Sequence, residues 1–221
     1  MILEVSGLSK NFNHTVALDN VSFEIRKSDI VGIVGPNGSG KTTLLNILAG
    51  TIRPTSGGYH FNNSQQIGMS ISRKGFFDDM SVKNNLKLIA RLNSIQEKEV
   101  IRVMNDFQID FSDKSFGKLS AGMKQRVSLA VPFLKNQDLI LLDEPSNHLD
   151  IDSIMILRSK ILQSKEVGAS FLITSHILSD LEKVCDRILF MKKGKIISNK
   201  SREELLIAYE NLEDAYLKIA K

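Results

Sequence analysis

Apolar residues along the chain repeat with different periods in different regions, and these periods predict the order of its elements. Residues 2–5 have strand character, and apolar and polar residues alternate over 21–25, the pattern of a strand with one buried face. Residues 30–34 form a nearly continuous apolar run, which is typical of a central strand buried on both faces. A helix is expected over 41–49, and a turn over 53–58, where Pro, Ser and Gly gather.

Residues 72–136 have a helical period instead. Ser81 is placed to cap a helix that runs to about residue 93, and a stripe of apolar residues follows over 96–107. Ser120 is expected to begin a third helix. We interpret this segment as a helical lobe inserted into an α/β domain.

Strand and helix patterns alternate over the rest of the chain, with strands expected at 139–142, 170–174, 187–191 and 195–198 and helices at 152–165, 178–184 and 202–221. Strands that alternate with helices form a parallel sheet with crossover connections. The predicted fold class is therefore α/β, with a mainly parallel sheet, an antiparallel β element at the N-terminus and the inserted helical lobe.

The segment that follows the buried strand has the pattern of a phosphate-binding loop, with the residues Gly35, Pro36, Asn37, Gly38, Ser39, Gly40, Lys41 and Thr42. Glycines let backbone N–H groups wrap an anion, and the helix that follows adds the positive end of its dipole. Lys41 supplies a full charge to the β- and γ-phosphates, and the Thr42 hydroxyl is placed to ligate Mg²⁺. An accidental match occurs about once in a hundred chains of this length, so the pattern predicts a P-loop NTPase core that binds ATP, with Thr43 in the same turn.

Two consecutive carboxylates end the apolar run at 139–142. Because the carboxyl ends of parallel strands face the ligand crevice, Asp143 and Glu144 are expected beside the phosphate loop. Asp143 can hold Mg²⁺ through water, and Glu144 is placed to orient and deprotonate the attacking water. A strand capped by exposed acids is a common alternative, which the phosphate loop upstream disfavours.

Composition narrows the picture only slightly. Hydrophobic residues make up 42% and charged residues 24% of the 221 residues, as in ordinary globular proteins. The net charge of +4 fits an ATP-binding protein, a nucleic-acid partner or an acidic membrane surface equally. Cys185 is the single cysteine, so no internal disulfide forms and a reducing compartment is expected. No signal peptide is expected, and no stretch reaches the ~18 apolar residues of a spanning helix, so another chain would have to supply any membrane spans.

Taken together, these residues resemble the nucleotide-binding subunit of ABC transporters over essentially the whole chain. The segment 119–126, Leu-Ser-Ala-Gly-Met-Lys-Gln-Arg, is similar to the signature motif of that family, usually written LSGGQ. The segment 148–150 falls where the family has its D-loop, and His176 stands where the switch histidine belongs. Phe12 occupies the place of the aromatic that stacks on adenine, with Val16 close to it.

The resemblance implies a single ABC ATPase domain over 1–221, with a RecA-like core at 1–71 and 137–221 and a helical signature lobe at 72–136. It implies a dimer, homodimeric or heterodimeric, in which the phosphate loop of one subunit and the signature of the other close on one ATP. The signature residues that would act in trans are Ser120, Ala121, Gly122 and Met123.

The same resemblance implies a role for several single residues. His176 would contact the γ-phosphate, and Asp150 would serve the dimer interface. Three of the residues to which the resemblance gives a role also have a plainer alternative. His176 could be a polar cap at a strand end, Ser120 could be only a helix N-cap, and Phe12 could be an ordinary core residue.

The chain departs from the family pattern at three positions. The family usually places a glutamine at the start of the helical lobe, where this chain has Ser72. Serine is too short to reach Mg²⁺ or the attacking water directly, though a water could bridge; we therefore expect slower hydrolysis, with Ser72 as a further candidate near the metal. Ala121 and Met123 replace a glycine and a glutamine of the signature, a variation that occurs among exporters of peptides and antibiotics.

Two function classes remain after these comparisons of motifs. In the first, the chain powers a membrane exporter of peptides, drugs or similar compounds, because residues 211–217 resemble the tail of such proteins. The chain would then lie at the cytoplasmic face of the cell membrane, bound to a separately encoded transmembrane permease, with no nucleic-acid partner. In the second, the chain is a soluble ABC ATPase that acts on the ribosome. Residues 144–150 resemble the motif of that branch, although its members carry two ATPase domains in one chain. The sequence leaves the substrate and the direction of transport open.

Overall fold

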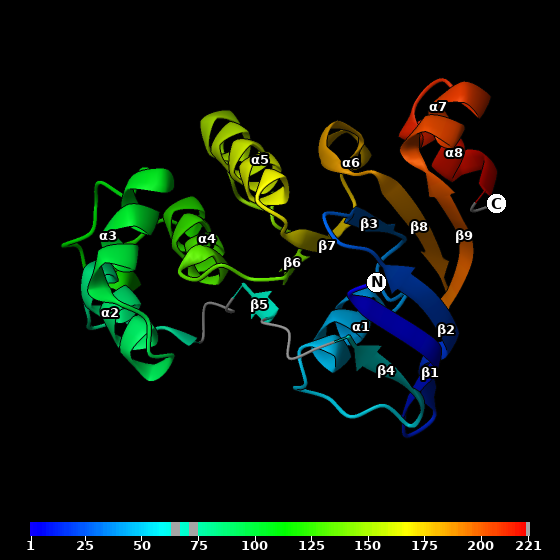
Figure 1. Cartoon of the computed structure of the whole chain (residues 1–221), viewed down its shortest axis with the longest axis horizontal. Coiled ribbons are helices and arrows are strands. Elements are labelled where there is room, and N and C mark those ends of the chain that lie inside the picture. Colours follow the sequence, from blue (N-terminus) through cyan, green and yellow to red (C-terminus); the bar gives the residue numbers. More distant parts are fainter. Residues whose placement is uncertain (63–66, 71–74, 220–221) are drawn as a thin grey trace.

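The computed structural model describes residues 1–62, 67–70 and 75–219, which form two β-sheets, helices on both sides of the larger sheet, and a helical lobe (Figure 1). The helical lobe, with α2, α3 and α4, lies at one end of the molecule, and the C-terminal helices α7 and α8 lie at the other. Among the described residues, no helix is long and apolar enough to cross a membrane.

The smaller sheet is antiparallel, in the order β2–β1–β4, and contains β2 at Thr15–Ile25, β1 at Leu3–Phe12 and β4 at Ser56–Phe61. It confirms the antiparallel β element, but the turn predicted over 53–58 is wrong in its second half, because β4 begins there. Gly57 has φ +70, and a Cβ on it would lie 2.1 Å from the carbonyl oxygen of Gly7 on β1. The glycines that suggested a turn therefore allow two strands to approach.

The larger sheet has six strands in the order β5–β6–β7–β3–β8–β9, with β5 at Ile67–Met69, β6 at Leu139–Asp143, β7 at Ser170–Ser175, β3 at Ile30–Val34, β8 at Arg187–Lys192 and β9 at Lys195–Ser201. The first five strands are parallel, and β9 pairs antiparallel with β8. The predicted mainly parallel sheet is confirmed.

Side chains alternate between two apolar cores on the two faces of this sheet. In β3, Ile30 and Val34 belong to the core shared with the helical lobe, α5, α6 and α8. Val31 and Ile33 belong to the core shared with α1 and the smaller sheet. All five residues of β3 are buried, which explains why this strand appears as a continuous apolar run rather than as an alternating one.

Two helices of the lobe, α2 and α4, begin directly after the expected caps Ser81 and Ser120. The bounds of the helices of the core and the lobe are α1 Lys41–Leu48, α2 Val82–Leu92, α3 Glu97–Asp106, α4 Ala121–Ala130, α5 Ile151–Glu166 and α6 Leu178–Val184. Ser81 and Ser120 each accept a hydrogen bond from a backbone N–H of the first turn of their helix. Short 3₁₀ turns at Phe116–Lys118 and Val131–Phe133 precede and follow α4.

The C-terminal segment contains two helices, α7 at Arg202–Ala208 and α8 at Leu212–Ile219, so the single helix expected over 202–221 is wrong. A capping box between Ser201 and Glu204 starts α7. Tyr209 is extended, and the side chain of Asn211 then accepts a hydrogen bond of 2.9 Å from the N–H of Asp214. The local cap at Asn211 starts a second helix and breaks the helical period.

Candidate functional site

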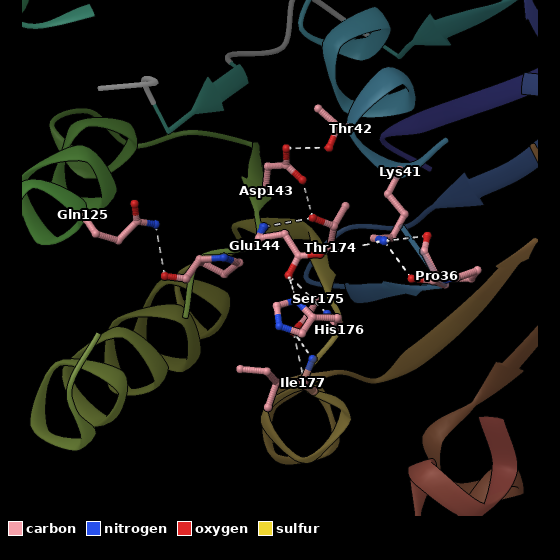
Figure 2. Close-up of polar contacts among 12 residues, drawn as sticks. Pro36, Lys41, Thr42, Gln125, Asp143, Glu144, Thr174, Ser175, His176 and Ile177 are labelled. Carbon is pink, nitrogen blue, oxygen red and sulfur yellow. Dashed lines mark hydrogen bonds and ion pairs between the residues drawn. The ribbon is translucent and has the colours of Figure 1, made fainter. Parts of the chain in front are cut away.

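Three neighbouring strands of the larger sheet bring the candidate site together at their carboxyl ends. β6, β7 and β3 are adjacent, and each is followed by a segment that carries polar or charged residues. Figure 2 shows Lys41 and Thr42 on one side of Asp143 and Glu144, and His176 on the other. The structure therefore brings together the residues that the phosphate loop, the acidic pair and the switch position predicted.

The phosphate loop approaches neighbouring backbone so closely that it needs its glycines. A Cβ on Gly35 would lie 2.2 Å from the carbonyl oxygen of Met191. Gly40 has φ +106, and a Cβ there would lie 2.4 Å from the carbonyl oxygen of Ala17. Side chains larger than hydrogen would push the loop open, so the cradle depends on these two positions.

The phosphate loop contains polar groups that can bind an anion. Gly40 is the N-cap of α1 and offers no capping side chain, so no side chain at this position satisfies the first N–H groups of the helix. The Ser39 hydroxyl is buried and has no hydrogen-bond partner in the described part of the chain. A phosphate group is the kind of ligand that fits both features.

Lys41 places its ammonium group at the mouth of the loop. Its Nζ donates to the carbonyl oxygens of Gly35, at 2.7 Å, and Pro36, at 3.3 Å. The same Nζ lies 3.8 Å from Oε1 of Glu144, and the side chain is only 6% exposed. The lysine thus stands between the phosphate cradle and the predicted catalytic carboxylate.

Asp143 holds two hydroxyl groups, one on each carboxylate oxygen. Thr42 donates to Oδ2 at 2.9 Å, and Thr174 donates to Oδ1 at 2.6 Å (Figure 2). One hydroxyl and one carboxylate, open to phosphate oxygens and water, match what Mg²⁺ takes from proteins in nucleotide sites. The described residues contain no cluster of three or more His, Cys, Asp or Glu that could hold a metal without such help.

Glu144 follows Asp143 in a conformation that is uncommon for a residue with a side chain, with φ +47. Its Oε2 accepts from the backbone N–H of His176 at 3.2 Å and lies 2.6 Å from Nδ1 of the same histidine. Because Oε1 faces Lys41, the carboxylate lies between two groups that also suit a γ-phosphate.

The signature segment lies apart from this cluster. Figure 1 shows α4 on the far side of β5 and β6 from α1. Ser120 is exposed, and its hydroxyl accepts a hydrogen bond from the N–H of Met123 at 3.2 Å. A Cβ on Gly122 would lie 2.7 Å from the carbonyl oxygen of His148, so this glycine lets the signature helix approach the D-loop of its own chain.

Asp150 makes contacts within its own chain at the start of α5. It caps α5 by accepting a hydrogen bond from the N–H of Ser153 at 2.8 Å. Hydrogen bonds from Ser153, with a smaller contribution from Arg126, hold the pKa of this carboxyl below its usual value. Arg126 also donates to the Ser153 hydroxyl at 2.5 Å, which joins the signature helix to the start of α5.

The remaining predicted residues lie at the edge of the site or outside it. Phe12 and Val16 flank the turn between β1 and β2 and are 44% and 56% exposed, so neither is core. The Nζ of Lys10 lies 4.8 Å from the centre of the Phe12 ring. Ser72 lies outside the described residues, and the prediction of slower hydrolysis stays a prediction.

Thr174 is the site residue that sequence reasoning missed. It bonds both acidic residues, because its hydroxyl also accepts from the N–H of Glu144 at 2.9 Å. The one available signal was a polar residue near the end of an otherwise apolar strand. Serine and threonine are too common at such places for that signal to suffice.

Comparisons with known proteins agree with this geometry. A sequence profile of the family described as ABC transporter matches residues 18–147. The lantibiotic transport ATP-binding protein SrtF of Streptococcus pyogenes is 33% identical over 223 aligned residues, 97% of this chain and 96% of that protein. The bacitracin transport ATP-binding protein BcrA of Bacillus licheniformis is 32% identical over 209 residues, 89% of this chain and 68% of that protein. A solved structure described as the ATP-binding subunit of an ABC transporter has the same fold, with a TM-score of 0.90 at 24% identity over 100% of both chains.

The fold and the phosphate loop define a P-loop nucleotide-binding protein. Because the family profile covers more than half of the chain and SrtF is similar over nearly all of it, the chain belongs to the ABC transporter family. It is an ATP-binding subunit of an ABC transporter and an ATPase that hydrolyses ATP.

Proposed function

We propose that this subunit powers the export of peptides, drugs or similar compounds, and that ATP drives two copies to close on each other. The similarity to SrtF over 97% of the chain carries the proposal, because SrtF is named for lantibiotic transport and the match covers 96% of its length. BcrA, named for bacitracin transport, supports the same substrate class. The resemblance of residues 211–217 to exporter tails agrees with both.

In this proposal both oxygens of the Glu144 carboxylate are paired with neighbouring side chains until a nucleotide binds. Lys41 and His176 contact the two oxygens of its carboxylate. The phosphates of ATP compete for both partners, since an ammonium and a histidine also pair with a γ-phosphate. Once Lys41 and His176 pair with the phosphates instead, the Glu144 carboxylate can accept a proton from the attacking water.

Mg²⁺ fits the residues present. Thr42 and Asp143 would hold it, and it would neutralise charge on the β- and γ-phosphates when bound. The amides of the loop from Gly35 to Gly40 hold and orient the phosphates, and Lys41 adds a full positive charge. Thr43, next to Thr42 in the first turn of α1, completes the set of proposed ATP contacts.

The second half of each ATP site would come from another copy, or from a related subunit. Ser120 and Gly122 lie at the exposed N-terminus of α4, apart from the phosphate loop of their own chain. A γ-phosphate that bridged the two chains would favour the closed dimer, and hydrolysis would remove that bridge. In this proposal Ala121 and Met123 line the same contact and Asp150 lies at the interface between the copies.

The proposal also includes the wider assembly. A separately encoded permease would supply the membrane spans, and this subunit would bind it from the cytoplasmic face without a nucleic-acid partner. The core at 1–71 and 137–221 would bind ATP, and the lobe at 72–136 would carry the signature.

Co-purification tests the choice between an exporter and a ribosomal ATPase. A tagged chain expressed in its native host is isolated from detergent-solubilised membranes, and the same lysate is sedimented through sucrose to collect ribosomes. The exporter proposal predicts a stoichiometric integral membrane protein in the first fraction and none of the chain with ribosomes. Sedimentation with ribosomes and no membrane partner would overturn it in favour of the second class, which residues 144–150 resemble.

A further inference from the structure

Thr174 connects the two acidic residues of the site through one hydroxyl group. It pairs with Asp143 in the register of the parallel strands β6 and β7, so both side chains leave the sheet at the same level. Its Oγ1 donates to Oδ1 of Asp143 at 2.6 Å and accepts from the N–H of Glu144 at 2.9 Å. The threonine has no exposed surface.

The hydrogen-bond count leaves this hydroxyl a single arrangement. A threonine hydroxyl has one proton to donate, and an ionised carboxylate and a backbone N–H can only accept and donate, respectively. The hydroxyl proton of Thr174 therefore points at the Asp143 carboxylate, and a lone pair of the hydroxyl oxygen accepts the hydrogen bond from the backbone N–H of Glu144. With Oδ1 fixed in this way, Oδ2 is the oxygen that faces Thr42.

We propose that Thr174 is a positioning residue for ATP hydrolysis, which sets the orientation of the Asp143 carboxylate and the backbone of Glu144 together. The inference rests on the roles proposed above for these two acidic residues. Carboxylates that bind a metal are commonly oriented by a hydrogen bond of this kind. Thr174 leaves Oδ2 free for the metal side of the site by holding Oδ1.

The conformation of Glu144 gives a second reason. A positive φ in a residue with a side chain persists only where neighbouring contacts hold it. Here the N–H of Glu144 points at Thr174 alone among the described residues, with 3.1 Å to its carbonyl oxygen and 2.9 Å to its hydroxyl. Loss of the hydroxyl would remove the shorter of these two contacts and so weaken the hold on the backbone that places the Glu144 carboxylate between Lys41 and His176.

A purely structural role is the alternative, and the same strand contains a matched control. Ser170 begins β7, is also fully buried, and donates its hydroxyl to the carbonyl oxygen of Arg26 at 3.1 Å. It lies at the amino end of the strand, away from the site. Loss of its hydroxyl tests what a buried hydrogen bond of β7 contributes to stability alone.

The experiment compares Thr174→Val, which keeps the shape and removes the hydroxyl, with Thr174→Ser, which keeps the hydroxyl. The purified full chain is assayed for kcat and KM for ATP. Calorimetry then measures ATP affinity with Mg²⁺ and with EDTA in the Glu144→Gln background. Thr174→Val should lower kcat about tenfold and reduce the gain in ATP affinity due to Mg²⁺. Affinity in EDTA should stay unchanged, and Thr174→Ser should restore most of both.

Three results would overturn the inference: normal kcat and Mg²⁺ dependence in Thr174→Val, no rescue by Thr174→Ser, or an equal loss in Ser170→Ala. If Thr174→Val does not fold, Thr174→Ser and Thr174→Ala differ by the same hydroxyl and decide the question. Parental hydrolysis by Glu144→Gln would instead overturn the proposed role of that glutamate, and this result is read without any change at Thr174.

Discussion

The helices α1 and α4 both begin next to sequence that is expected to meet a phosphate, yet their N-termini are built in different ways. At α1 the cap is Gly40, which leaves the helix without a capping side chain, and Lys41 is buried. At α4 the cap is Ser120, whose hydroxyl already bonds the first turn of its own helix. Ser120 is also exposed to solvent.

The residues that surround the N-termini of α1 and α4 also differ. Near α1 lie Asp143, Glu144 and His176, all joined by hydrogen bonds or ion pairs shorter than 4 Å. The start of α4 approaches the D-loop of its own chain, where a Cβ on Gly122 would lie 2.7 Å from the carbonyl oxygen of His148. The difference agrees with the proposal that the chain builds one half of an ATP site itself and presents the other half on its surface for a second chain.

The largest effect should come from Glu144→Gln, which removes the proposed base from the completed half. Loss of a general base costs about a hundred- to ten-thousandfold in rate, so kcat should fall about a thousandfold. ATP binding should remain, since the side chain keeps its size and Lys41 keeps its carbonyl partners. Because hydrolysis no longer opens the assembly, size-exclusion chromatography with ATP should show a trapped dimer.

Glu97→Gln is a suitable control for this prediction. Glu97 is also a carboxylate that pairs with a lysine, Lys87, but it lies on α3 in the helical lobe. Its hydrogen bond and charge contact with Lys87 hold its pKa below the usual value. Near-parental hydrolysis by Glu144→Gln, or an equal loss in Glu97→Gln, would contradict the assignment.

The second prediction concerns the exposed half. Ser120→Arg should leave ATP binding to the single chain unchanged, because Ser120 caps α4, which lies apart from α1 and the phosphate loop before it (Figure 1). It should abolish the ATP-dependent dimer in the Glu144→Gln background. In the otherwise parental chain it should lower kcat roughly 100-fold, as expected for a lost contact to the transferring phosphate. Equilibrium dialysis and size-exclusion chromatography measure the two effects separately.

Ser81→Arg provides the matched control, because Ser81 caps α2 in the same lobe through the same hydrogen bond. Each variant loses one N-cap, which costs about 1 kcal/mol of stability. Only the Ser120 variant should lose the dimer. If both variants dimerise alike, α4 does not face the second nucleotide site. If Ser120→Arg weakens ATP binding to the single chain, the two halves are not separate.

The completed half was largely predictable from the sequence because its chemistry demands particular residues at short spacing. The phosphate loop needs glycines, a lysine and a hydroxyl within eight positions, and the apolar run before Asp143 marks a strand end. The serine caps at Ser81 and Ser120 were predictable for the same reason. Each of these signals is local, so one chain segment contains the whole of it.

Two of the missed features depend on segments that meet only in the fold, whereas the third depends on a local side-chain cap. The start of β4 was expected to be a turn, because the match of Gly57 to Gly7 on β1 is not visible in either segment alone. Thr174 is 31 residues from Asp143, and only the register of β6 against β7 brings them together. The end of α7 at Ala208 depends on a side-chain cap that competes with a continuing helical period.

The smallest expected effect concerns Phe12, which we propose lies at the rim of the completed half. It is 44% exposed, so Phe12→Leu should change the stability of the fold little. Stacking on a base contributes about 1–3 kcal/mol, and leucine retains part of that contact, so KM for ATP should rise about fivefold while kcat stays near the parental value. Phe77→Leu, at a phenylalanine of the helical lobe that is 60% exposed, is the control. At saturating ATP the Phe12 variant should still dimerise in the Glu144→Gln background, because only single-chain affinity has changed. An unchanged KM would remove Phe12 from the ATP site, and a lost dimer would mean that the rim of one half also contacts the other.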